Sequence, residues 1–169
     1  MNKIIVLIAL IIAPIMSNAQ SYFDSLEDLN GVDMVVVTKD AFELISKFKN
    51  LKIDDNEGMK VFQMIQDLKE FKMFSTNDSE VANKMEGMVN TSIQKENLTQ
   101  LMRIKEDDSR VKIFVNASKS KDYVNEVLMF IRGFSNKTNK AFEAVIVSLT
   151  GTIDINKIYA LADTFVQNK

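Results

Sequence analysis

The chain has 169 residues, of which 26% are charged, a formal net charge of −2, and neither histidine nor cysteine. Without imidazole or thiol groups, Ser-His-Asp and Cys-His catalysis, zinc sites built on His or Cys, and disulfides are excluded. Nucleic acid is not expected as a partner, because phosphate binding needs a basic patch and the Lys and Arg residues here are scattered among acids.

The N-terminal segment has the order of a secretory signal peptide. Lys3 precedes the apolar run 4–13, and the small residues 17–19 end the segment before Gln20. The run of about ten apolar residues is shorter than the roughly 20 needed to span a bilayer. We expect residues 1–19 to be removed and the protein to be periplasmic or secreted, with no transmembrane span. Bacterial lipoproteins are acylated on cysteine, which this chain lacks, so a lipoprotein is not expected.

Residues 20–169 suit one domain with a single core. The polar and aromatic leader 20–30 is expected to dock as an irregular arm or a short helical turn. A strand follows at 34–38, where three consecutive valines favour coverage on both faces of a sheet. The helical spacing of apolar residues then predicts a helix over 39–49.

Two further helices with a strand between them are predicted next. Asp54 and Glu57 have the spacing of a capping box and begin a helix that reaches about residue 66. The segment 68–75 loses the helical period and is expected to be a strand. Asn77, three residues before Glu80, predicts the N-cap of a helix that reaches about residue 94.

The second half of the chain predicts strands joined by short connections. Segment 98–106 is expected to be part helical turn and part strand. With segment 111–116, which alternates as a strand, it flanks the tight turn 107–110 and predicts a β-hairpin. Segments 124–131 and 142–149 are the richest in β-branched and apolar residues, and we expect them to form the centre of the core.

A glycine turn and a closing helix are predicted after these strands. Gly151 is expected to make the turn, and Asp154 to cap a helix whose start is fixed by packing between Ile153 and Ile158. The element order predicts an α+β two-layer sandwich, with one twisted, mostly antiparallel mixed sheet of five or six strands and helices on one face. The first strand is the one for which a parallel pairing is considered.

Four blocks of sequence carry a resemblance to a known family: Gly31–Phe42, Leu68–Thr76, Glu126–Met129 and Leu149–Asp154. Together they resemble an exported family of Bacteroidota catalogued as domain of unknown function 4252. The resemblance covers nearly all of residues 20–169. It implies a small secreted or envelope domain with no assigned activity, and therefore no family catalytic residues.

Three possible chemical sites have simpler structural interpretations. Met85 and Met88 lie one helical turn apart and present thioethers that bind Cu(I), but methionine is a common core filler. The acidic stretch 54–58 resembles half of a calcium loop, but Ile53 stands where an EF-hand needs a ligand. The 118–121 segment contains two Ser-Lys pairs, which are typical of a solubilising turn.

Glu126 and Glu143 are the two carboxylates that we considered for glycoside hydrolysis. That reaction needs the groups roughly 5 to 9.5 Å apart in a cleft with aromatic platforms. The chain has no Trp and only three Tyr, so exposed charges on strands are the simpler interpretation. We expect no catalytic residue, no metal and no cofactor, and therefore no enzyme.

Two functional hypotheses remain. The first is a non-enzymatic envelope domain that binds another protein or a second copy of itself, through a sheet edge or an uncovered sheet face. Its candidate contact residues are Phe114, Phe130, Phe142 and Ile146. The second is a carrier that holds an apolar or lipid-like molecule between helices and sheet.

Overall fold

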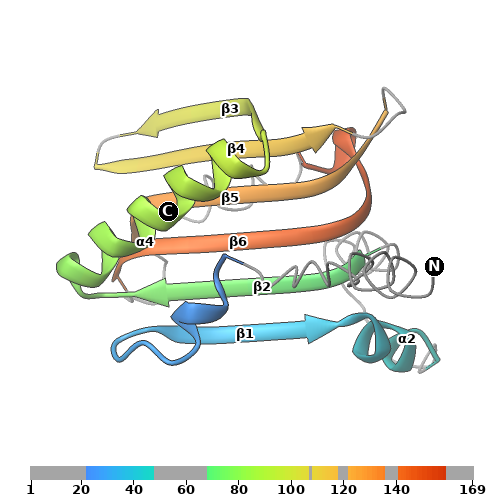
Figure 1. Ribbon diagram of the computed structural model, residues 1–169, viewed down its shortest axis with the longest axis horizontal. Coiled ribbons are helices and arrows are strands. Elements are labelled where there is room, and N and C mark those ends of the chain that lie inside the picture. The colour runs from blue at the N-terminus through green and yellow to red at the C-terminus, as the bar shows by residue number, and fades with distance from the viewer. Residues whose placement is uncertain (1–21, 48–67, 107, 118–121, 136–140, 159–169) are drawn as a thin grey trace, which may run out of the picture.

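The computed structural model describes residues 22–47, 68–106, 108–117, 122–135 and 141–158. The elements are η1 (Asp24–Leu26), β1 (Asp33–Thr38), α2 (Lys39–Lys47), β2 (Leu68–Thr76), α4 (Ser79–Lys95), β3 (Thr99–Glu106), β4 (Ser109–Ala117), β5 (Tyr123–Ser135) and β6 (Ala141–Asp154). The strands form one sheet in the order β1-β2-β6-β5-β4-β3 (Figure 1).

All five pairings between these strands are antiparallel. The predicted α+β class and the upper estimate of six strands are therefore confirmed, and so is the predicted hairpin, which is β3–β4. The first strand pairs antiparallel with β2, so the parallel pairing considered for it does not occur. The chain makes a meander from β3 to β6 and places β2 on the far side of β6.

The core lies on both faces of the central strands. On one face, α4 crosses the sheet (Figure 1). It buries Val81, Met85 and Val89 against residues such as Phe74 and Leu128. On the other face, the apolar cluster is built largely from strand residues and is joined by side chains from outside the sheet: Phe42 of α2, together with Ile158. The long helix thus covers one face as expected, and shorter segments contribute to the other.

The N-cap of α4 is Asp78, one residue later than the predicted Asn77. The Asp78 carboxylate accepts hydrogen bonds from the backbone N–H groups of Glu80 at 2.8 Å and Val81 at 2.9 Å. The backbone N–H of Asp78 is itself bonded to the Thr76 hydroxyl, 3.1 Å away, which fixes the entry into the helix. A carboxylate also complements the positive end of the helix dipole better than an amide does.

The glycine turn predicted at Gly151 is wrong, because β6 continues through it to Asp154. Gly151 is buried and has φ +147°, a conformation that glycine adopts readily. The strand pairing is irregular on both sides of this position, between Leu68 and Glu70 of β2 and between Val124 and Glu126 of β5. Glycine therefore accommodates bulges in a continuous strand here.

The leader forms the short helical turn η1, one of the two forms expected for it. An ion pair whose lysine is nearly buried fixes this turn to the sheet. Lys72 of β2 donates to the Asp24 carboxylate, at 2.7 Å, and Glu70 lies 3.6 Å away. Desolvation lowers the pKa of Lys72, but the hydrogen bond to Asp24 and the neighbouring carboxylates outweigh it and leave the pKa raised. Phe23 and Leu26 are buried beside this pair.

The closing helix begins as predicted. Residues 155–158 are helical, and the Asp154 carboxylate accepts a 2.8 Å hydrogen bond from the Asn156 N–H. Several predictions lie outside the described residues: the signal peptide, the helix over 54–66 with its acidic stretch, the 118–121 segment, and the closing helix beyond residue 158.

Candidate functional site

The strand β1 is an edge of the sheet with exposed apolar side chains. Met34 is 43% exposed, Val35 46% and Val36 36%. The prediction that this run is covered on both faces is therefore wrong. The same kind of run, Val127–Ile131 in β5, is buried on both faces, because β5 lies at the centre of the sheet between the two apolar clusters, whereas β1 lies at the end of the strand order.

Both faces of β1 contribute to this exposed surface. Met34 lies opposite Phe74 in the register with β2, so it shares the face that carries α4, and Val36 shares that face too. Val35 lies opposite Met73 and points to the other face. A strand added beside β1 would therefore gain apolar contacts above and below the sheet. We call Met34–Val37 the β1 edge.

The opposite edge of the sheet, β3, is built differently. It carries the charged residues Arg103, Lys105 and Glu106 along its length. Charged side chains on an edge strand hinder pairing with another chain, whereas a flat uncharged edge favours it. The β1 edge has no charged residue between Asp33 and Lys39, so of the two sheet edges it is the one suited to accept a strand.

The four candidate contact residues from the sequence do not form an exposed surface. Phe114, Phe130 and Ile146 lie together under α4, and Phe130 is only 1% exposed. Phe142 is partly buried and packs against the cluster on the other face. In the isolated chain, three of the four therefore serve the core and are not accessible to a partner.

The β1 edge was missed because consecutive valines suit a central strand and an edge strand equally well. One signal was available in the sequence. The predicted strand at 34–38 is much shorter than the segments that build β5 and β6, and short strands are one way in which natural sheets limit exposed edges.

The two carboxylates considered for hydrolysis are far apart. Glu126 lies opposite Thr150 of β6, seven residues along that strand from Glu143, a separation of about 23 Å. They also point to opposite faces, since Glu126 shares the side of Leu128 and Glu143 that of Val145. This geometry does not support a glycosidase pair.

Glu126 instead pairs with Glu96, which follows the last turn of α4. The pKa of Glu126 is raised to about 7, first by desolvation on burial and then by a hydrogen bond to Glu96 and the charge of that carboxylate. The backbone carbonyl of Glu96 also accepts a 3.4 Å hydrogen bond from the Asn116 amide. Because the pKa of Glu126 is raised, the two carboxyl groups can lie together where the end of α4 meets the sheet.

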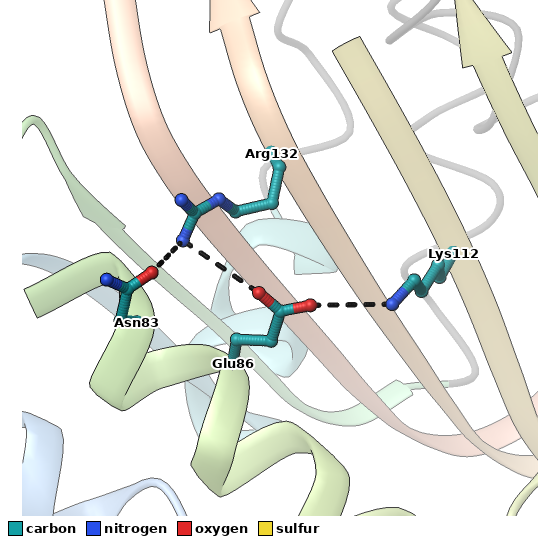
Figure 2. Close-up of polar contacts among 4 residues, drawn as sticks. All are labelled: Asn83, Glu86, Lys112 and Arg132. Atoms are coloured by element: carbon teal, nitrogen blue, oxygen red, sulfur yellow. Dashed lines mark hydrogen bonds and ion pairs between the residues drawn. The ribbon is translucent and has the colours of Figure 1, made fainter. Parts of the chain in front are cut away.

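A second polar cluster fixes the middle of α4 (Figure 2). Glu86 projects from the helix between Lys112 of β4, at 3.5 Å, and Arg132 of β5, at 4.0 Å. Arg132 also donates to the Asn83 side chain at 3.2 Å. These side chains are partly exposed, so each ion pair contributes at most about 1 kcal/mol. The arrangement positions a helix and contains no nucleophile with an adjacent base.

The methionine pair also serves packing. Met85 is fully buried in the core under α4, and Met88 is partly buried against the same cluster. In the described part of the chain, no group of three or more Asp, Glu, His or Cys side chains is placed to hold a metal ion. Likewise, every buried side-chain nitrogen or oxygen there has a hydrogen-bond partner. None of the described helices is long and apolar enough to cross a membrane.

Comparison with known proteins gives one match. A family model described as "Domain of unknown function (DUF4252)" matches residues 23–161, which include all six described strands and α4. No curated protein and no solved structure matches the chain.

Proposed function

The chain belongs to the DUF4252 family, and from that premise we propose that it is a non-enzymatic domain that binds a protein strand along the β1 edge. The observation that carries the proposal is the exposure of Met34, Val35 and Val36 on an edge strand that has no charged residue between Asp33 and Lys39. Soluble proteins normally protect such an edge with charges or cover it.

Strand addition fits this surface better than binding to a flat face. An added strand gains main-chain hydrogen bonds from the edge, and alternate side chains gain contacts on the two faces. The β1 edge offers Met34 and Val36 on one face and Val35 on the other. Leu44 of helix α2, which directly follows β1, is also exposed.

We place the protein outside the cytoplasm, in the periplasm or secreted, on the basis of the signal-peptide pattern in residues 1–19. The resemblance to an exported family of Bacteroidota supports an envelope role. Mass spectrometry of the protein recovered from the periplasm and medium tests this placement. We expect a chain that starts at Gln20. Recovery from the cytoplasm alone, with residues 1–19 attached, would contradict export.

The interaction is tested by photo-crosslinking in the native cell. A photoreactive amino acid is introduced at Val35 in one strain and at Gln100, an exposed position on β3, in a control strain. We expect a discrete crosslinked protein adduct from position 35 and none from position 100. Equal labelling from both positions, or none from position 35, would rule out the β1 edge as the binding element.

The carrier hypothesis stays a prediction, because no described contact favours it. The apolar space between α4 and the sheet is occupied by side chains of the chain itself, including Phe74, Met85 and Phe130.

A further inference from the structure

We infer that the partner at the β1 edge is a second copy of this chain, joined antiparallel through β1 about a two-fold axis. This inference rests on the proposed use of the β1 edge and adds the identity of the strand that pairs with it. The reasons are the symmetry of strand pairing, the distribution of apolar residues in β1, and the charges at its two ends.

Symmetry restricts how two copies of β1 can pair. When a two-fold axis relates two antiparallel strands of one sheet, the axis is perpendicular to the sheet. It passes between the two strands at one residue, which then lies directly opposite the same residue of the second copy. Both copies then keep α4 on the same side of a continuous sheet. The six strands of each copy would join without any rearrangement of the core.

The charges flanking the β1 edge select the register. With the axis at Val36, Asp33 lies opposite the start of α2 of the second copy, where Lys39 is the first helical residue, and the same approach occurs again on the other side of the axis. With the axis at Val35, Asp33 would face the apolar Val37 instead. Asp33 and Lys39 are both exposed. Lys39 also forms an ion pair with Glu43 of its own helix, at 3.3 Å, and an exposed pair of this kind is weak enough to be exchanged for, or shared with, a new partner.

The apolar contacts in this register are also self-complementary. Val36 meets Val36, Val35 meets Val37, and Met34 meets Thr38 across the junction. Neighbouring β-branched pairs across strands stabilise a sheet by roughly 0.2–1 kcal/mol each. The contact covers the side chains that are exposed in the single chain, on both faces.

The interface between the two copies is short, and its size sets the expected affinity of the dimer. β1 has six residues, so pairing through it alone falls at the small end of specific interfaces, below about 1,200 Å². We therefore expect a reversible dimer with a dissociation constant on the order of micromolar. Sedimentation velocity of the purified protein, from roughly 1 to 500 μM, should show a shift from monomer to dimer.

Variants at the axis and at the charged ends test the register. Val36→Lys places two like charges against each other and should weaken the dimer by at least about tenfold. Asp33→Lys should weaken it as well, and Asp33→Lys combined with Lys39→Asp should restore it to within about threefold of the original, because the pair is re-formed with its signs exchanged. Gln100→Lys on β3 is the matched control and should leave the dimer unchanged.

Because the substituted positions are exposed, we expect every variant to fold. Circular dichroism and thermal unfolding at low concentration check this. A monomer at every concentration would overturn the inference. So would a dimer that survives Val36→Lys, one that Gln100→Lys disrupts, or one that the double charge exchange fails to restore.

The identity of the crosslinked adduct separates this inference from the proposed function. Mass spectrometry of the adduct formed at position 35 should identify the same chain on both sides of the crosslink. A different protein would overturn the self-pairing and keep the proposed function. The absence of any adduct at position 35 would overturn both.

Discussion

At the scale of single residues, Gly133 is the position where the fold depends most directly on the lack of a side chain. It has φ +67°, and a Cβ atom there would lie 2.4 Å from the backbone oxygen of Asp108. Its carbonyl accepts a 2.6 Å hydrogen bond from the Ser109 hydroxyl. The glycine thus lets the end of β5 approach the β3–β4 turn.

Gly133→Ala should lower the free energy of unfolding by about 2–3 kcal/mol, from steric overlap and backbone strain together. Gly87→Ala is the matched control. Gly87 lies within α4 with open space around the added methyl, so alanine should stabilise the protein by roughly 0.5–1 kcal/mol. Urea unfolding measures both changes, and a Gly133→Ala protein as stable as the original would contradict the described approach to Asp108.

Glu126 gives the protein a pH-dependent stability. The pKa of Glu126 is about 7 in the folded chain, against an ordinary value of 4.5. Between pH 4.5 and 7, Glu126 therefore keeps its proton in the folded chain and has lost it in the unfolded chain. The folded state then binds more protons than the unfolded state, so the contribution of this group falls as the pH rises from 4.5 to 7 and is constant above 7.

Glu126→Gln should therefore remove a decline in stability between pH 4.5 and 7. Because Glu126 is half-buried, we expect the free energy of unfolding of Glu126→Gln at pH 8 to exceed that of the original protein by roughly 1 kcal/mol, after allowance for solvent screening. Thermal unfolding from pH 4 to 8 measures the difference. Glu143→Gln, on the neighbouring strand and far from Glu96, is the control and should keep the decline in stability with rising pH. If Glu126→Gln and the original protein show the same dependence of stability on pH, Glu126 and Glu96 do not form the described carboxyl pair.

At the scale of elements, α4 begins where Asp78 supplies the oxygen that its first N–H groups need. Asp78→Ala leaves the N–H groups of Glu80 and Val81 without this acceptor, and it should cost about 1 kcal/mol. Asn77→Ala, at the position that the sequence pattern indicated, should change stability by less than about 0.5 kcal/mol. Denaturant unfolding of the pair decides which residue is the cap, and the reverse ranking would place it at Asn77.

At the scale of the whole molecule, the sheet should be most stable at its centre and least stable at β1. Amide hydrogens of Val127–Ile131 lie in a strand that is bonded on both sides and buried on both faces, whereas those of Met34–Val37 lie at an exposed edge. Regions with few buried contacts open with lower free energies. Hydrogen exchange of a dilute sample should be much slower in β5 than in β1.

The same measurement at high concentration connects stability to assembly. If β1 pairs with a second copy, its amides should become more protected as the concentration rises, while those of β3 should not change. Protection of β1 equal to that of β5 in the dilute monomer would mean that this edge is already covered.

Local sequence patterns were sufficient to predict most helices and strands, because helical periodicity, strand alternation and capping depend on residues close together in the chain. The helical period around Val81, Met85 and Val89 located α4, and the alternation in 111–116 located β4. The cap at Asp78 was missed by one residue, because Asn77 and Asp78 are both good capping residues. The bulge at Gly151 was missed because a glycine before a helix cap is equally typical of a turn.

The sequence by itself determined the α+β class, the order of the described elements and the central place of β5 and β6, because these follow from periodicity and from the burial of long apolar segments. Only the tertiary structure decided which apolar run stays exposed. It inserted β2 between β1 and β6, placed Phe130 and Ile146 under α4, and left Met34–Val36 at the edge. The physical reason is that the exposure of a strand depends on its neighbours in the sheet, which pair with it from distant parts of the chain.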